Sequence, residues 1–389
     1  MKEISDCLTE KKWLDALNAL EYGTLQFGAP DGTIHLFRAP HPGPKASFML
    51  RDWGVLRRAA ERGDIAFGED YIDGAWDSDD IEALVSLFLI NRSVMGSYAN
   101  GNFLSRMMLM LHNRVTRRNS LTGSKRNIEA HYDVGNDFYR LWLDPSMTYS
   151  SALYLRTGEN LETAQQNKYR RILDRFARPR ADVLEIGCGW GGFAERAVGA
   201  GHHVTGLTIS PSQHRFAQAR LGSKADIRLE DYRKVKGRFD MVVSIEMFEA
   251  VGERYWPQYF QSVSERLRRG GRAVIQTIAI RDDLFTAYRM RSDFIRHYVF
   301  PGGMLPSLQR FGAEAERAGL KVASRFSFGQ DYARTLRDWS VRMQENKGKI
   351  LGLGHDERFF RNWQYYLNIC AAAFRVGRTD VAQVELVKV

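Results

Sequence analysis

The chain has 389 residues, of which 44% are hydrophobic and 26% charged, a composition typical of a folded protein with a sizeable core. Its formal net charge of +10 predicts an anionic partner, either a phospholipid surface or nucleic acid. The three cysteines lie far apart in no paired spacing, which argues against a disulfide framework and a zinc site. We therefore expect no metal and a reducing compartment.

The length predicts roughly two domains. No apolar run approaches the roughly 20 residues that span a bilayer, and residues 1–7 lack the apolar core of a signal peptide. We therefore expect a cytoplasmic protein whose contact with the inner face of the membrane is peripheral.

Residues 1–127 are predicted to form a small α+β domain, because short strand, turn and helix patterns alternate before residue 90. Residues 103–115 then form a helix pattern with a broad apolar side, followed by a basic cluster: Arg117, Arg118, Lys125 and Arg126. Such a helix is typical of an interfacial membrane contact. At about 1 kcal/mol for each cation, the cluster supplies roughly 4 kcal/mol, enough for transient docking. Segment 103–126 is thus a candidate lipid contact, with an interdomain helix as the alternative.

Residues 128–389 are predicted to form one domain in which strands and helices alternate, as in a doubly wound α/β sheet. The predicted strands are 183–186, 203–210, 225–229, 239–245 and 273–280, followed by 321–326 and 380–388. An aromatic-rich insertion with a Pro-Gly-Gly break at about 283–308 interrupts the alternation. Because ligands bind beyond the carboxyl ends of such strands, this insertion is predicted to be a substrate lid.

Four glycines among residues 187–192 follow the first apolar strand of this domain, Val183–Ile186. Glycine there lets the backbone approach a ligand closely. A dinucleotide site requires an acidic residue about 20 positions on, and the strand 203–210 ends without one. Glu185, just before the glycines, instead gives an order that resembles class I S-adenosylmethionine methyltransferases. The predicted fold is therefore a class I methyltransferase, with a Rossmann-like sheet.

Several further stretches, taken in order and spacing, resemble the cyclopropane-fatty-acyl-phospholipid synthase family from about residue 60 to the end. They are His131–Tyr139, Met147–Ala152, the glycine turn with Trp190, Gly206–Ser210 with Gln213, Phe248-Glu249 with Val251-Gly252, Phe300–Gly303 and Phe328–Tyr332.

The resemblance implies S-adenosylmethionine-dependent chemistry on a cis double bond in the acyl chain of a membrane phospholipid. The alkene attacks the sulfonium methyl group, a carbocation forms on the chain, and a base removes a proton so that a cyclopropane ring closes. Loss of a different proton gives a methylene or methyl branch instead. Such a reaction needs an apolar slot that aligns the alkene, excludes water and offers aromatic faces to the cation.

In the family, a bound bicarbonate ion is the base, held by a Cys, a Glu, a His and a Tyr. By this resemblance the Glu is Glu249 and the Tyr is Tyr332. Ser151 stands where the family usually has Cys, and Gln276 stands where it usually has His. Both retain hydrogen-bond donors, although neither carries the charge of an imidazolium. Ala250, where a His commonly follows the Glu, is a third change.

The same resemblance assigns the cofactor contacts. Gly187 and Gly189 are expected at the amino-acid end of S-adenosylmethionine. The remaining contacts are Thr208, Ile209 and Gln213 on the ribose and adenine side, Tyr149 and Ser150 from the segment before the sheet, Asp231 at the adenine amine and Tyr232 beside its ring.

Three alternatives remain at this point. The first is methylation of a soluble or carrier-bound unsaturated substrate, and the second is a cofactor-binding protein that has lost catalysis, suggested by Ser151 and Gln276. The third is nucleic-acid methylation, but no recognisable nucleic-acid module accompanies the basic charge, so we expect no nucleic acid. A homodimer is compatible with the sequence, which does not determine the oligomeric state.

Overall fold

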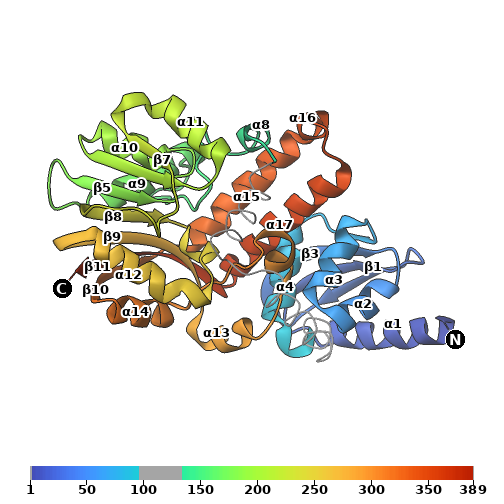
Figure 1. The fold of residues 1–389 in the computed structure, drawn as a ribbon. Coiled ribbons are helices and arrows are strands. Elements are labelled where there is room, and N and C mark those ends of the chain that lie inside the picture. The colour runs from blue at the N-terminus through green and yellow to red at the C-terminus, as the bar shows by residue number, and fades with distance from the viewer. Residues whose placement is uncertain (1, 96–133, 389) are drawn as a thin grey trace. The chain divides into compact units, whose positions relative to one another are not determined.

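The computed structural model in Figure 1 describes residues 2–95 and 134–388. The predicted lipid contact 103–126 lies outside the described residues. In the part of the chain that is described, no helix combines the length and the apolar character needed to cross a bilayer.

The chain divides into two compact units, and the predicted boundary at 127/128 lies outside the described residues. The first unit combines the residues up to 95 with Met290–Val299 and Met343–Val376. The second combines residues 134–289, Phe300–Arg342 and 377–388. Part of the predicted lid thus groups with the N-terminal residues: the ring of Phe294 lies 4.8 Å from that of Tyr365, and the Tyr298 hydroxyl donates to Glu69 at 2.6 Å. Contacts between such distant segments leave no periodic signal in the sequence.

The first unit is an α+β structure with a four-stranded sheet in the order β2-β1-β3-β4. Strands β1 and β3 are parallel, and the other pairs are antiparallel. Its elements are α1 (Lys2–Asn18), β1 (Tyr22–Gly28), β2 (Ile34–Arg38), β3 (His41–Leu50), α2 (Gly54–Arg62), α3 (Asp64–Ile72), β4 (Trp76–Asp77), α4 (Ile81–Ile90), a short π-helix (Ile295–Val299), α16 (Lys347–Gly352) and α17 (Glu357–Arg375).

Aromatic rings fill the space between this sheet and its helices. Trp13 of α1 contacts Phe27 of β1 and Phe48 of β3, with ring centroids 6.2 and 5.9 Å apart, and Phe67 of α3 stacks on Trp76 at 4.3 Å. Aromatic rings bury about 150–250 Å² each, so the cluster contributes a large apolar area to the core of this unit.

A fully buried amide, Asn91, joins α4 to the start of β1. Its side-chain oxygen accepts hydrogen bonds from the backbone nitrogens of Glu21 and Tyr22, and its nitrogen donates to the carbonyls of Tyr22 and Leu87. All four bonds are 2.9–3.0 Å long. The amide therefore satisfies backbone groups that water does not reach.

We predict that Asn91→Ala lowers the free energy of unfolding by about 2–4 kcal/mol, because it leaves several buried backbone groups without partners. Urea unfolding followed by circular dichroism measures this loss. The exposed Asn18→Ala, at the end of α1, is the matched control and is expected to change stability by less than about 0.5 kcal/mol. An equal, small effect of both variants would contradict the prediction.

The second unit is built on a seven-stranded sheet in the order β10-β11-β9-β8-β5-β6-β7. Its strands are β5 (Asp182–Ile186), β6 (His203–Thr208), β7 (Asp226–Leu229), β8 (Phe239–Ile245), β9 (Leu267–Ile280), β10 (Leu320–Ser327) and β11 (Thr379–Lys388). Its helices are α8 (Asn136–Arg140), α9 (Leu161–Leu173), α10 (Gly192–Gly199), α11 (Pro211–Leu221), α12 (Trp256–Arg266), α13 (Asp282–Arg289), α14 (Leu308–Arg317) and α15 (Gly329–Glu345), whose last turn falls in the first unit, with three 3₁₀ turns at Gly222–Lys224, Phe248–Ala250 and Glu253–Tyr255.

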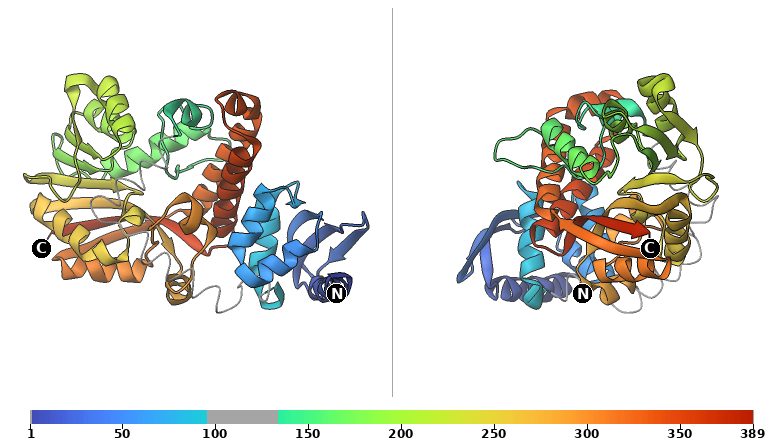
Figure 2. Two further views of the ribbon diagram at one scale, coloured as in Figure 1. Left: turned by 45° about the vertical axis from the view of Figure 1, so that its right-hand side comes forward. Right: turned by 90° about the vertical axis from the view of Figure 1, so that its left-hand side faces the viewer.

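Strands β5 to β9 run parallel, and β11 is antiparallel to both of its neighbours. Helices α9, α10 and α11 pack on one face, and α12 and α14 pack on the other. Figures 1 and 2 show these layers from three directions. The predicted doubly wound fold is therefore confirmed. Strand order reverses at β5, which pairs with both β6 and β8, and such a reversal opens a ligand crevice at the carboxyl ends of the strands.

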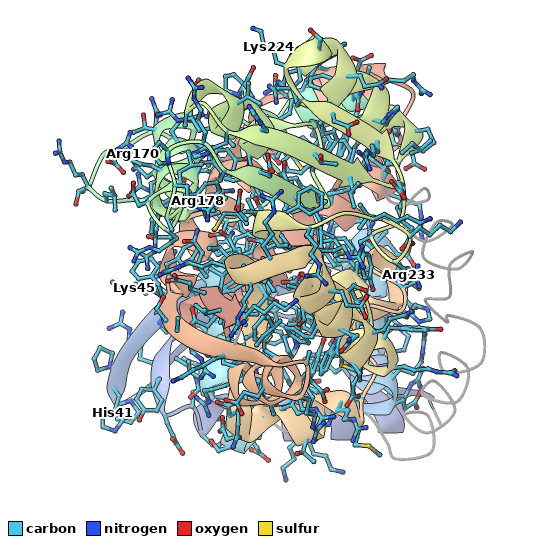
Figure 3. All side chains as sticks on the ribbon, turned by 60° about the vertical axis from the view of Figure 1, so that its left-hand side comes forward. His41, Lys45, Arg170, Arg178, Lys224 and Arg233 are labelled. Carbon is cyan, nitrogen blue, oxygen red and sulfur yellow. The ribbon has the colours of Figure 1, made fainter. Side chains whose placement is uncertain are left out.

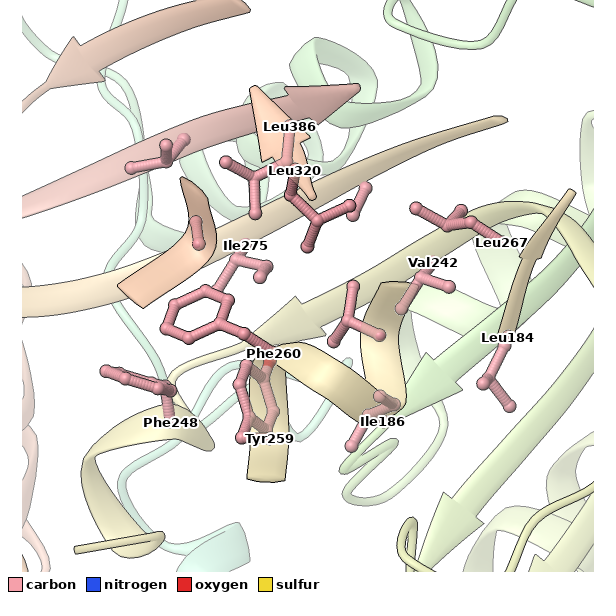
Figure 4. Close-up of a cluster of buried hydrophobic side chains, with 14 of the residues drawn as sticks. Leu184, Ile186, Val242, Phe248, Tyr259, Phe260, Leu267, Ile275, Leu320 and Leu386 are labelled. Atoms are coloured by element: carbon pink, nitrogen blue, oxygen red, sulfur yellow. The ribbon is translucent and has the colours of Figure 1, made fainter. Parts of the chain in front are cut away.

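The face covered by α12 and α14 has a continuous apolar core, shown in Figure 4. Leu184 and Ile186 of β5, Val242 of β8 and Ile275 of β9 contribute from the sheet, and each is at most 2% exposed. Because these strands are buried on both faces, they read as continuous apolar runs in the sequence. The core thereby fixes the strand ends on which the site is built.

Candidate active site

The glycine turn after β5 leaves room above the carboxyl edge of the sheet. Gly187 and Gly189 have φ angles of 82° and 54°, which few residues other than glycine adopt without strain. A Cβ at Gly187 would lie 2.8 Å from Cγ of Met247, whereas one at Gly189 would meet no atom within 4 Å. Gly189 therefore borders open space, where a ligand can approach the backbone.

Glu185 lies buried beneath this turn, near the N-terminus of α10. Burial raises the pKa of its carboxyl to about 8, against the opposing effects of Lys168 and of the backbone N–H of Ala194. Its Oε2 has no hydrogen-bond partner among the described residues. The carboxyl is thus held mainly in its neutral form near pH 7.

The segment before α9 is fastened to the glycine turn. The indole N–H of Trp190 donates to Oδ1 of Asn136 at 2.8 Å, and Arg220 donates to the carbonyls of Ser146 and Trp190 at 2.9 and 3.1 Å. The segment also follows the turn closely, because a Cβ at Gly192 would lie 3.2 Å from Oγ1 of Thr148.

Tyr149 and Ser150, two predicted cofactor residues, lie in this segment. The ring of Tyr149 is 5.5 Å from that of Trp142 and 5.4 Å from that of Trp339. Ser150 is buried, and its hydroxyl accepts a 2.6 Å hydrogen bond from Nζ of Lys168.

Lys168 is fully buried in α9, and its burial lowers the pKa of its ammonium to about 7. Glu246, Asp144 and Glu185 act in the opposite direction. The lysine therefore places a titratable cation under the site.

The end of β6 presents the predicted residues Thr208, Ile209 and Gln213 together. The Thr208 hydroxyl donates to Oε1 of Gln213 at 3.0 Å, and both residues are buried, whereas Ile209 is partly exposed. Ser210 caps α11 by accepting from the backbone nitrogen of Gln213. The cap and the hydroxyl orient the Gln213 side chain toward the strand end.

Asp231 and Tyr232 follow β7. Both oxygens of Asp231 accept from Arg233, at 2.8 and 2.6 Å from its guanidinium, and Figure 3 labels Arg233. The ring of Tyr232 packs edge-on against Tyr259 at 5.5 Å. Asp231 thus already has a cationic partner, a pairing that the sequence analysis did not foresee.

Three of the four predicted catalytic residues donate hydrogen bonds to Glu246, a residue that the sequence analysis did not single out. Oε1 of Glu246 accepts from the backbone nitrogen of Ser151 at 2.9 Å and from Nε2 of Gln276 at 2.7 Å. Its Oε2 accepts from the Tyr332 hydroxyl at 2.6 Å. The available signal was an acid directly after the buried strand β8, where a parallel sheet binds ligands.

The amide of Gln276 is oriented by a second glutamine. Gln383 of β11 lies opposite Gln276 of β9 in the sheet register, and its Nε2 donates to Oε1 of Gln276 at 3.1 Å. The Gln276 oxygen is thereby engaged, and its nitrogen faces the Glu246 carboxylate. In addition, the backbone nitrogen of Glu246 donates to the Gln276 carbonyl at 2.8 Å.

These contacts bear on the expected bicarbonate ion. The donors that would surround it are directed at the carboxylate of Glu246 instead, and the Ser151 hydroxyl donates to the carbonyl of Ala152. The residues present therefore do not fit a separate bicarbonate ion among Ser151, Gln276 and Tyr332.

Glu249, the fourth predicted catalytic residue, lies shortly after Glu246, in the 3₁₀ turn Phe248–Ala250. Its Oε1 accepts from the Thr277 hydroxyl at 2.9 Å and from the backbone nitrogen of Ile278, while its buried Oε2 has no partner among the described residues. Burial, with a contribution from Glu246, raises the pKa of Glu249 to about 8. The structure therefore contains two neighbouring carboxyls with different partners.

Among the residues expected in the lid, Phe300–Gly303 lies against Glu249. The backbone nitrogen of Met304 donates to the Glu249 carbonyl at 2.9 Å, and a Cβ at Gly303 would lie 3.5 Å from the same oxygen. Residues 290–299 belong to the first unit, as described above.

The buried carboxyl of Glu185 makes stability depend on pH. Because its pKa in the folded protein is raised to about 8, its contribution is complete below the ordinary glutamate pKa and is lost as the pH rises through about 8. We predict that the wild type loses up to about 1.4 kcal/mol of stability per pH unit relative to Glu185→Gln between about pH 6 and 8.

Urea unfolding of the cofactor-free proteins at several pH values measures this difference. The lowered pKa of Lys168 makes stability depend on pH with the opposite sign. Because Lys168 is present in both proteins, its effect largely cancels in the difference between them. Glu195→Gln, at an exposed position of α10, is the control and is expected to give a difference that does not vary with pH. A constant difference for Glu185→Gln as well would contradict the assignment.

Comparison with known proteins identifies the family. A model of the mycolic acid cyclopropane synthetase family matches residues 119–384. The chain is 35% identical over 364 residues to the tuberculostearic acid methyltransferase UfaA1 of Mycobacterium tuberculosis, covering 90% of this chain and 85% of that protein. It is 33% identical over 345 residues to the cyclopropane-fatty-acyl-phospholipid synthase of Escherichia coli K12, covering 87% of each.

Among solved structures, mycolic acid cyclopropane synthase CmaA1 in complex with SAH and CTAB is similar to the chain with a TM-score of 0.64 and 31% identity, covering 68% of this chain and 98% of that one. These similarities confirm the relationship predicted from the sequence motifs. The chain belongs to the mycolic acid cyclopropane synthetase family of S-adenosylmethionine-dependent methyltransferases.

Proposed function

We propose that the protein transfers a methyl or methylene carbon from S-adenosylmethionine to the cis double bond of unsaturated acyl chains in phospholipids. The observation that carries this proposal is the hydrogen-bonded carboxylate of Glu246, beside the carboxyl ends of β5 and β8, in a chain of this family. The names of the relatives support a fatty-acyl or mycolic acid substrate.

The residues at the strand ends fit S-adenosylmethionine. The backbone at Gly187 and Gly189 would receive its amino-acid end, and Thr208, Ile209 and Gln213 would flank the ribose and adenine. Asp231 and Tyr232 would complete the adenine side, while Tyr149 and Ser150 would close the site from the preceding segment. When bound, the cofactor supplies an electrophilic methyl group on sulfur.

Aromatic rings stand near the proposed reaction centre. Tyr332, which binds Glu246, has its ring 6.2 Å from that of Trp339, and Trp339 in turn contacts Trp142 and Tyr149. Aromatic faces stabilise a cation and exclude water from it. This group therefore suits a reaction in which positive charge develops on an apolar chain.

The product is a cyclopropane ring if the proton lost comes from the transferred methyl group. A methylene- or methyl-branched acyl chain is the second candidate product. Two observations favour this product: Glu246 takes the place predicted for the bicarbonate ion, and one relative is named a tuberculostearic acid methyltransferase rather than a cyclopropane synthase.

We further propose that the protein works at the surface of an anionic membrane. The net charge of +10 and the basic cluster predicted within 103–126 support membrane contact. Arg170, Arg178 and Lys224 are exposed cations of the second unit, and Figure 3 labels them.

The function is tested by incubating the protein with labelled S-adenosylmethionine and vesicles of unsaturated phospholipid, followed by mass analysis of the acyl chains. We predict a gain of one CH₂. Loss of the double bond with this gain indicates a ring, and retained unsaturation indicates a methylene or methyl branch. No gain with vesicles, together with a gain on acyl-carrier-bound or nucleic-acid substrates, would contradict the proposal.

The cofactor site is tested at Gly189. We predict that Gly189→Val weakens S-adenosylmethionine binding by at least about tenfold, because the side chain would enter the space beside the backbone. Calorimetry measures the dissociation constant. Gly270→Val is the matched control, since Gly270 also has a positive φ, of 71°, and open surroundings but lies at an exposed position of β9, away from the glycine turn. Equal affinities of the two variants would contradict the site.

A further inference from the structure

Glu246 adopts a backbone conformation that is unusual for its residue type. Its φ is 50°, and Met147 is the other non-glycine residue with a positive φ in the described part of the chain. A left-handed backbone costs a residue with a Cβ free energy that glycine does not lose. Such strain is retained where the surrounding structure holds it, and it is frequent at functional sites.

The strained backbone places the carboxylate among donors from three separate parts of the second unit. Ser151 belongs to the segment before α9, Gln276 to β9 and Tyr332 to α15. Each donor points a hydrogen at an oxygen of Glu246, an arrangement that favours the ionised carboxylate. Lys168 also stabilises its negative charge, whereas burial raises the pKa of Glu246. Burial thus increases the basicity of a carboxylate whose charged form the three donors and Lys168 stabilise.

Its neighbour Glu249 differs in protonation. The pKa of about 8 keeps the Glu249 carboxyl largely neutral near pH 7, and the charge of Glu246 contributes to that shift. Two adjacent carboxyls with different hydrogen-bond partners divide acid and base roles between them. Of the pair, Glu246 is therefore the one available to accept a proton.

We propose that the carboxylate of Glu246 is the base that removes the proton from the methylated acyl chain, so that the reaction requires no bicarbonate. This inference rests on the proposed function and names its proton acceptor. Tyr332, Gln276 and the Ser151 backbone position this base, and Gln383 positions it through Gln276.

The electrons balance within the proposed groups. A carbon of the alkene forms a bond to the methyl carbon while the carbon–sulfur bond breaks, and that electron pair remains on the sulfur. The other alkene carbon becomes cationic. Glu246 then takes a proton, from the transferred methyl group or from a neighbouring chain carbon. The released C–H pair forms the ring bond or a new double bond, and Glu246 becomes a neutral carboxylic acid.

The test uses the full-length protein with unsaturated phospholipid vesicles and S-adenosylmethionine. Glu246→Gln keeps the size of the side chain but removes its basicity, and we predict that its turnover falls by about 10²–10⁴-fold. The dissociation constant of S-adenosylmethionine is expected to stay within about threefold, which separates loss of the base from loss of the cofactor site. Glu249→Gln is expected to lose less, because that carboxyl is already mostly neutral.

A second arm removes dissolved carbon dioxide and bicarbonate from the assay. The wild type is expected to keep its turnover. Glu246→Gly relieves the strain of the positive φ and leaves the position of the carboxylate open. This variant is expected to regain part of its turnover when bicarbonate is added. Glu265→Gln, at an exposed position of α12, controls for the loss of a surface charge. The wild-type measurement holds even if a variant fails to fold.

A wild type that depends on bicarbonate, or a folded Glu246→Gln variant with undiminished turnover, would overturn the proposal while leaving the proposed function intact. If the wild type modifies no acyl chain under any condition, the proposed function itself fails.

Discussion

The arrangement at the centre of the second unit depends on one interaction, the three-donor hydrogen bonding of the Glu246 carboxylate. A carboxylate with reduced hydration is costly unless its oxygens are satisfied. Here a backbone N–H, an amide and a phenol satisfy them at 2.6–2.9 Å. Because these donors come from a loop, a strand and a helix, the same contacts that stabilise the charge also hold those three elements in register.

The sheet makes this convergence feasible. Strand β8 ends at Ile245, opposite Gln276 of the longer strand β9, so the residue after β8 is adjacent to Gln276. Strand β11 then supplies Gln383 on the other side of β9. The glycine turn follows β5, the other neighbour of β8. The proposed binding site of the methyl donor and the proposed proton acceptor therefore lie at the ends of adjacent strands.

The sequence predicted the parts of the fold that leave a local pattern. Continuous apolar strands such as Val183–Ile186, and the glycines after them, revealed the sheet and its ligand edge. The segments that make up the first unit were harder to predict. Those that contain Phe294 and Tyr365 belong to it through contacts over long sequence separations. Glu246 was missed for the same reason. Its donors lie 95, 30 and 86 residues away, and its positive φ has no signature in the residue order.

The most direct test of this account is a crystal structure of the protein with SAH and an acyl-chain analogue, grown in the presence of bicarbonate. The account predicts that the Glu246 carboxylate accepts from Ser151, Gln276 and Tyr332, with no separate anion among them and with an oxygen facing the acyl chain. A planar anion bound by these three residues, with the Glu246 side chain turned away, would contradict it.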